Sequence, residues 1–283
     1  MSAAGDGAGR RKPRFALPPP ATDAHCHVFG PAAVFPYAPA RRYTPDDAPK
    51  EALFALHAHL GVGRAVIVQA SCHGADNRAM LDAIAARPHT TRGIAIIDER
   101  HSDADLRAMN AAGIRGVRFN FVRHLGGGPD AAAIHNIVER IRPLGWHVVL
   151  HFDAEGLIAH DALIRSLPLP FVIDHMGRVP AADGPEQPAV RALLDLAKLD
   201  RCWIKVCGAE RIDLPPYDKA AVIARAIVAA VPDRVLWGTD FPHPNPTHVC
   251  DEADLVDLLP QIALTAEWQW KLLVDNPARL YGF

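Results

Sequence analysis

The chain has 283 residues, of which 49% are hydrophobic and 22% are charged, and its formal net charge is −2. This composition suits one large globular domain or two small ones. The near-neutral charge excludes a broad electrostatic attraction to nucleic acid or to an acidic membrane, so any cluster of arginines has to serve a local anion, such as a small acidic ligand.

Residues 1–20 contain basic side chains but no apolar run of signal-sequence length, and we interpret them as a flexible leader before a single domain over 21–283. No later stretch approaches the length of a membrane span. The five cysteines are odd in number and form no CxxC pair, which argues against a disulfide framework and against a zinc knuckle. We therefore expect a cytoplasmic protein without membrane or nucleic-acid partners.

Eight short apolar runs, continuous rather than alternating, predict strands that are buried on both faces. They cover residues 22–27, 64–71, 92–98, 115–121, 147–153, 170–177, 202–208 and 234–242. Seven segments between them have apolar residues at three- and four-residue spacing, which is typical of crossover helices. They cover residues 50–60, 77–87, 103–112, 131–144, 157–167, 189–199 and 219–231.

Eight strand-then-helix units without a break in composition predict a single (β/α)₈ TIM barrel. A doubly wound open sheet is the alternative. It would need a glycine-rich phosphate turn after the first strand, and "HCHVFGPAA" is not such a turn. In a TIM barrel the active site lies at the carboxyl ends of the strands, so the polar residues there are the candidates for function.

Polar side chains close most of the predicted strands. In the first strand, His25 and His27 are two residues apart and should share one face, with Cys26 on the other. The later strands end in or carry Gln69, Ser71, Arg118, Asn120, His151, Asp153, Asp174, His175, Arg178, Asp240 and His243. A single strand-end histidine is more often a hydrogen-bonded core residue than a functional one. Four strands that bring histidines and Asp240 to one barrel axis predict an active site.

These residues resemble the amidohydrolase superfamily, in its amidohydrolase-2 branch of lactonases and decarboxylases, from about residue 21 onward. The likeness rests on "DAHCH", on the histidines that end the fifth and sixth strands, and on "GTDFPHP". The strings "VIVQASCHGADN", "GIRGVRFNF", "VIDHMGR" and "WGTDFPHPN" resemble most the 2-pyrone-4,6-dicarboxylate hydrolase-like lactonases. Those enzymes open a cyclic ester that bears two carboxylates, during bacterial breakdown of lignin aromatics.

The resemblance implies a role for each matching position. Asp240 would be the general base that activates water, and His25, His27 and His175 would polarise the lactone carbonyl. The residues implied in substrate binding are Arg118, Arg178, Arg211, Tyr43, Ser71 and His243, with Arg123 and His124 where these lactonases carry an arginine. Arg118 also stands out by itself, because a cation inside a buried strand is costly unless an anion meets it.

The fifth strand departs from the lactonase pattern, since it ends in His151 where those enzymes have a tyrosine. Metal-dependent relatives bind zinc or manganese through the HxH pair, a fifth-strand histidine and the eighth-strand aspartate, which correspond to His25, His27, His151 and Asp240. Three imidazoles and one carboxylate with an open position are a sound catalytic zinc set. The alternative is that His151 only donates a hydrogen bond to substrate. The sequence leaves both open.

We therefore expect a hydrolase that opens a small anionic lactone, 2-pyrone-4,6-dicarboxylate or a similar one, by attack of water on the ring ester carbonyl. The alternatives are a metal-dependent decarboxylase of an unsaturated acid and a sugar-lactone hydrolase. A non-catalytic binding barrel is disfavoured, because it needs neither a base nor a histidine cluster. The ring substituents, the metal and the oligomeric state stay open, with a homodimer as one option.

Overall fold

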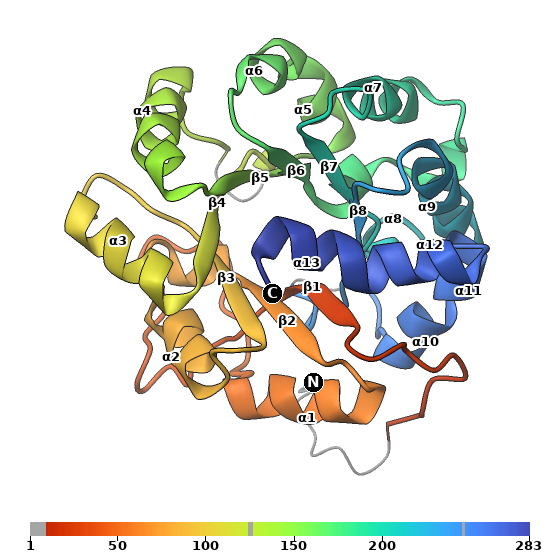
Figure 1. Ribbon diagram of the computed structural model, residues 1–283, viewed down its shortest axis with the longest axis horizontal. Helices are drawn as coiled ribbons and strands as arrows, with labels where there is room; N and C mark the ends of the chain where they lie inside the picture. Colours follow the sequence, from red (N-terminus) through yellow and green to blue (C-terminus); the bar gives the residue numbers. More distant parts are fainter. Residues whose placement is uncertain (1–9, 124–126, 245–246) are drawn as a thin grey trace.

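The computed structural model describes residues 10–123, 127–244 and 247–283, and their eight parallel strands follow one another around a barrel in the order β1 to β8 (Figure 1). The strands are β1 (Thr22–Cys26), β2 (Arg64–Val68), β3 (Thr91–Ala95), β4 (Ile114–Asn120), β5 (His147–His151), β6 (Phe171–Ile173), β7 (Cys202–Lys205) and β8 (Val235–Leu236). Each overlaps one of the eight predicted apolar runs, with β3 and β4 beginning one residue earlier than predicted, so the predicted TIM barrel is confirmed.

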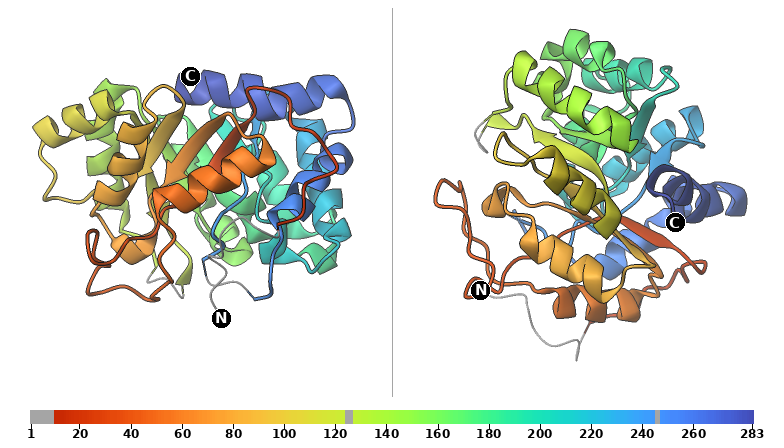
Figure 2. Two further views of the ribbon diagram at one scale, coloured as in Figure 1. Left: turned by 90° about the horizontal axis from the view of Figure 1, so that it is seen from below. Right: turned by 60° about the vertical axis from the view of Figure 1, so that its left-hand side comes forward.

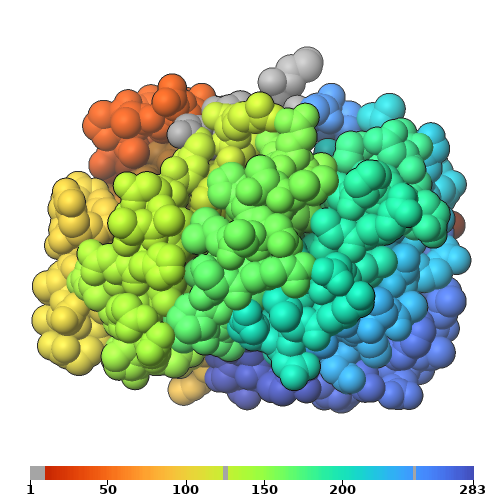
Figure 3. All heavy atoms as spheres, turned by 90° about the horizontal axis from the view of Figure 1, so that it is seen from above, coloured from red at the N-terminus to blue at the C-terminus, as the bar shows by residue number. Residues whose placement is uncertain are grey.

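Helices cover the outside of the barrel (Figure 1), and in the space-filling view the segments from α3 to α7 form much of one face of the molecule (Figure 3). They are α1 (Lys50–Leu60), α2 (Arg78–Ala86), α3 (Asp103–Ala112), α4 (Ala131–Ile141), α5 (Ala154–Ala159), α6 (Asp161–Ser166), α7 (Pro188–Leu196), α8 (Ala209–Ile212), α9 (Asp218–Ala230), α10 (Glu252–Asp257), α11 (Leu259–Ile262), α12 (Ala266–Trp270) and α13 (Asn276–Tyr281). The helix predicted over 157–167 is broken at His160, whose Nδ1 donates to the carbonyl of Gly156 at 2.8 Å.

Backbone hydrogen bonds between β1 and the segment after β8 join the first and last strands. Ala24 N donates to the carbonyl of Trp237, and Asp240 N donates to the carbonyl of His25, both at 2.8 Å. Beside them, the buried carboxylate of Asp23 accepts a hydrogen bond of 2.6 Å from the Thr239 hydroxyl. These contacts fix the backbone of Asp240 against the backbone of the HxH pair.

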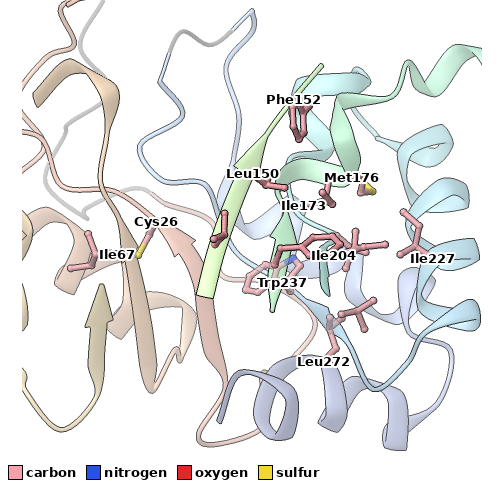
Figure 4. Packing of buried hydrophobic residues seen from close by; sticks show 14 of the residues in the cluster. Cys26, Ile67, Leu150, Phe152, Ile173, Met176, Ile204, Ile227, Trp237 and Leu272 are labelled. Atoms are coloured by element: carbon pink, nitrogen blue, oxygen red, sulfur yellow. The ribbon is translucent and has the colours of Figure 1, made fainter. Parts of the chain in front are cut away.

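The apolar core has two parts, separated by the barrel wall. Between wall and helices lies a large layer that includes Cys26, Ile67 and Trp237 (Figure 4). Inside the barrel, small and β-branched side chains form a second cluster, which Tyr281 of α13 completes. Figure 2 shows α13 at one end of the barrel and the segment between β1 and α1 at the other. The apolar cluster fills the end of the barrel interior next to α13. The inward-pointing polar residues therefore lie at the opposite end.

The described part of the predicted leader, residues 10–20, is attached to the barrel. Arg10 pairs with Glu252 of α10 at 3.1 Å, and Arg11 pairs with Asp254 at 2.7 Å and with Asp257 at 2.8 Å. The five cysteines, all within the described residues, are free thiols, as their number and spacing predict. None of the described helices has the length and apolar character needed to cross a membrane.

Candidate active site

A bulge in β1 turns both histidines of the HxH pair into the barrel. Asp23 pairs with Ala65 and Cys26 pairs with Ile67, so three steps along β1 match two along β2. An extra residue of this kind reverses the alternation of side chains beyond it. His25 and His27 consequently point inward with ring centroids 5.0 Å apart, while Cys26 packs in the outer layer.

The inward-pointing residues line a pocket that, together with the open solvent at its mouth, contains about 450 Å³ of space free of protein atoms. Its walls are His27, Tyr43, Ser71, Arg118, His151, His175, Arg178, Arg211, Asp240 and Pro244. Nine of these ten residues were predicted from the sequence. The pocket thus gathers residues from every strand or strand-following loop except β3, at the end where a TIM barrel holds its active site.

Asp240 lies at the bottom of the pocket and is fully buried. Its Oδ1 is 3.2 Å from His27 Nε2 and 3.6 Å from His25 Nε2, and its Oδ2 accepts hydrogen bonds from Arg211. Burial alone would raise the pKa of this carboxyl, but the positive charge of Arg211 and the nearby histidines hold it well below its usual range. Asp240 is therefore an ionised carboxylate at neutral pH.

A buried charge network lies behind His25. Lys205 Nζ, from β7, is 3.0 Å from His25 Nδ1 and 3.1 Å from Asp174 Oδ1, and Arg118 Nε donates to Asp174 Oδ2 at 3.1 Å. Because an ammonium can only donate, His25 Nδ1 accepts and the ring proton is left on Nε2, facing Asp240. Burial, followed by the charge of Lys205, lowers the pKa of His25 to about 4, so the ring is neutral.

The same network corrects the expectation for Arg118. The sequence predicts that a substrate carboxylate meets this buried cation, but the structure already supplies Asp174 as the partner of its Nε. The guanidinium still lines the pocket. Arg178 differs, because no carboxylate of the described residues forms an ion pair with it, although burial and the neighbouring Arg211 lower its pKa. Arg178 is therefore the guanidinium with the greatest need of an external anion.

His175 and His151 form the opposite wall. Their ring centroids are 5.2 Å apart, and His175 is 4.4 Å from His25 by the same measure. Burial lowers the pKa of both well below the usual range, so both rings are neutral. His175 Nδ1 is 3.4 Å from the thiol of Cys207, whereas neither ring nitrogen of His151 has a partner in the described chain. His151 is thus free to bond to a ligand.

Strained backbone is concentrated in the two loops that carry these groups. His175, Arg178, Asp240 and His243 all have positive φ, between 50° and 60°. Side chains with a Cβ adopt this region at a cost of about 1 kcal/mol or more each. The hydrogen bond from Asp240 N to the carbonyl of His25 is one of the contacts that hold this geometry.

Two predicted binding residues, His243 and Arg123, lie outside the pocket lining. His243 is buried away from the pocket lining, with its two ring nitrogens 3.6 Å from Glu210 and 3.5 Å from Glu252. Arg123 has a 75% exposed side chain that pairs with Glu155, and it does not line the pocket. His124 lies outside the described residues. The substrate-binding roles assigned to these three stay predictions.

Sequence reasoning missed Lys205, which orients His25 from inside β7. The signal was present, because a lysine in the middle of "CWIKVCG" is as unusual as the arginine in "GVRFNF". It also missed Pro244, whose carbonyl accepts a hydrogen bond of 2.8 Å from Arg211. Only the folded loop after β8 reveals that contact.

Three of the four predicted metal ligands converge. Ligand atoms of His25, His27 and Asp240 lie within 4.8 Å of one another, whereas His151 is not part of this group. Two imidazoles and one carboxylate are donors that zinc accepts, and His25 Nε2 has no hydrogen-bond partner in the described chain. The set therefore fits a divalent ion by its donor chemistry.

Eight parallel strands around a polar pocket, with histidines and an aspartate at the carboxyl ends of the strands, have the architecture of a TIM-barrel enzyme. Residues 22–283 match the amidohydrolase family, and the chain belongs to that family. The predicted resemblance is therefore confirmed.

Comparison with named relatives and solved structures gives the same family. The chain is 47% identical to a 2-pyrone-4,6-dicarboxylate hydrolase of Comamonas testosteroni, over 95% of this chain and 92% of that one. It is 41% identical to a 4-sulfomuconolactone hydrolase of Rhizobium radiobacter, over 95% and 92%. A crystal structure of an Acinetobacter baumannii protein with citric acid bound superimposes with a TM-score of 0.81 at 28% identity, covering 93% of this chain and all of that one.

Proposed function

We propose that this chain hydrolyses a carboxylated lactone, 2-pyrone-4,6-dicarboxylate or a close analogue. The observation that carries the proposal is the pocket itself, which Arg118, Arg178 and Arg211 line together with an ionised Asp240. Three guanidiniums around one small cavity favour a substrate with more than one carboxylate. The names of the 47% and 41% identical relatives support a lactone, and the citric acid bound to the A. baumannii protein supports a polycarboxylate.

In the proposed reaction, Asp240 accepts a proton from water as the water oxygen bonds to the ring carbonyl carbon. The bond from that carbon to the ring oxygen then breaks, and the proton passes to the leaving oxygen. We assign the Nε2–H of His25 and the neutral rings of His175 and His151 as donors to the carbonyl oxygen as negative charge develops there; the hydrogen bond from Lys205 to His25 Nδ1 supports this tautomer of His25.

Through Arg211, substrate binding would also change the basicity of Asp240. Its pair with Asp240 keeps the carboxylate ionised but also makes it a weak base. A substrate carboxylate that competes for Arg211 would weaken this pair and raise the basicity of Asp240 when substrate is in place. The base is then strongest in the complex that needs it.

A divalent ion, zinc or manganese, would be held by His25, His27 and Asp240, and when bound it would polarise the carbonyl and acidify water. The hydrogen bond from Lys205 opposes this, because it favours the His25 tautomer whose Nε2 carries a proton. For a metal to bind, His25 has to donate Nδ1–H to Asp174, which is 3.3 Å away.

The test is a comparison of two pyrones, one with carboxylates at positions 4 and 6 and one without. We expect the purified chain to open the dicarboxylate, read as loss of pyrone absorbance with release of a proton, at a kcat/KM at least ~30-fold above that of the uncharged pyrone. Release of carbon dioxide would show a decarboxylase instead. Equal rates on both pyrones would contradict the role of the arginines.

A further inference from the structure

A second group of metal-ligating side chains lies beside the pocket, outside its lining. Glu210 follows β7 at the start of α8, while His243 and Cys250 come from the segment after β8. One ligand atom from each lies within 4.8 Å of the other two. Glu210 and His243 are more than nine-tenths buried, and neither carboxylate oxygen of Glu210 has a hydrogen-bond donor among the described residues.

The spacing of these atoms suits a shared ion better than direct bonds. His243 Nδ1 is 3.6 Å from Glu210 Oε1, whereas a charge-assisted hydrogen bond between such groups measures about 2.7–2.9 Å. Ligands about 2.0–2.3 Å from a tetrahedral zinc ion are roughly 3.3–3.7 Å apart, because a tetrahedral edge is about 1.6 times the distance from centre to corner. The gap thus has the size of one edge of a coordination shell.

The surroundings complete such a site. The other ring nitrogen of His243, Nε2, faces Glu252 Oε1 at 3.5 Å without a hydrogen bond, so a small approach of the two groups would give the carboxylate–histidine pair that orients a metal-bound imidazole. Glu252 is in turn paired with Arg10 at 3.1 Å. Arg211 Nε, 3.7 Å from Glu210 Oε1, is the nearest charge on the other side, and it is already committed to Asp240.

We propose that Glu210, His243 and Cys250 bind a divalent transition metal of the zinc type, with Glu252 behind His243 and a water in the fourth position. A carboxylate, an imidazole and a thiolate are a zinc ligand set. The ion would tie the segment after β8 to α8. Pro244, whose carbonyl holds Arg211, lies in that segment, so the site would support the pocket from outside. The proposal does not depend on which substrate the pocket accepts.

Cobalt provides the sharpest test, because a thiolate ligand gives bound Co²⁺ a charge-transfer absorption that imidazole and carboxylate do not. The set of His25, His27 and Asp240 contains no sulfur and is therefore silent in this assay. The full-length protein is stripped with a chelator, reloaded with Co²⁺, and compared with three serine variants. Cys250→Ser removes the proposed ligand. Cys207→Ser tests the cluster of His25, His175 and Cys207, and Cys202→Ser removes a buried thiol outside these groups.

We expect the thiolate band in the wild-type protein, in Cys207→Ser and in Cys202→Ser, and its loss in Cys250→Ser. Zinc content should fall by about one equivalent in Cys250→Ser alone, and added Zn²⁺ should raise the melting temperature of the other three proteins more than that of this variant, which keeps His25, His27 and Asp240. Absence of the band from the wild-type protein, or its survival in Cys250→Ser, would overturn the proposal. His243 would then be an imidazolium shared by Glu210 and Glu252.

Discussion

The two arginines next to Asp240 in the pocket lining, Arg211 and Arg178, differ in whether a protein carboxylate pairs with them. Asp240 is kept ionised by Arg211, and Arg211 is held in place by the carbonyl of Pro244. Arg178 has no such protein partner among the described residues and faces the same space. The unpaired guanidinium is therefore the one whose loss should affect the substrate most and the fold least.

Arg178→Met should lower kcat/KM for the pyrone dicarboxylate by ~30- to 1000-fold, which corresponds to about 2–4 kcal/mol for a lost buried charge partner. The loss should shrink for a substrate that lacks one carboxylate. Steady-state kinetics on both substrates measure this, with Arg191→Met on the exposed face of α7 as the matched control. An equal loss on both substrates would mean that Arg178 has a structural role only.

Lys205→Met tests the tautomer of His25. Without the ammonium, the pKa of His25 should rise from about 4, because Lys205 is the second-largest cause of its depression after burial. His25 Nδ1 would then be free to donate to Asp174, which keeps Arg118 as a partner. An NMR titration of the histidine rings gives the pKa directly. An unchanged value would show that Lys205 does not set the protonation of His25.

At the scale of elements, the sequence was most informative about β-strands that are buried on both faces. Continuous apolar runs located all eight strands, the polar residues that close them located seven pocket residues, and the family resemblance added Tyr43 and Arg211. The bulge in β1 could not be predicted, because it depends on pairing with β2 and not on local preference. Helices α10 to α13 take the place of the eighth helix after β8, and they were missed because each covers only four to six residues and shows no long apolar repeat.

His243 shows where sequence reasoning stops. Its place in "GTDFPHP", three residues after Asp240, suggests the pocket, but its positive φ turns the ring toward Glu210 and Glu252. Glu210, by contrast, belongs to no sequence motif and was not predicted as a functional residue, although it lies next to His243. Only the approach of two loops that follow different strands brings these residues together.

The whole molecule encloses several neutral histidines, and this should make its stability depend on pH. Burial lowers the pKa of His25 to about 4 and that of His147, inside the barrel beside Tyr281, to about 3. An unfolded chain binds protons to these groups below pH ~6.5, whereas the folded barrel does not. Stability is therefore full above pH ~6.5 and falls as the pH drops toward 4, by on the order of 3 kcal/mol for His25 alone.

Urea unfolding at a series of pH values measures this slope, and His147→Leu is the diagnostic variant. It replaces a ring whose Nε2 has no partner in the described chain with an apolar side chain of the core. The variant should unfold with a shallower pH dependence between 6.5 and 4. Identical slopes for variant and wild type would show that His147 is not held neutral.

The central claim is that Asp240 takes a proton from the water that opens a carboxylated lactone, and the most direct measurement is the turnover of 2-pyrone-4,6-dicarboxylate by Asp240→Asn. The amide keeps the shape of the side chain but cannot accept the proton, so kcat should fall by ~10²-fold or more while the substrate still binds. Asp153→Asn is the control, since Asp153 caps α5 outside the pocket lining and asparagine caps a helix equally well. Wild-type turnover in Asp240→Asn would contradict the mechanism.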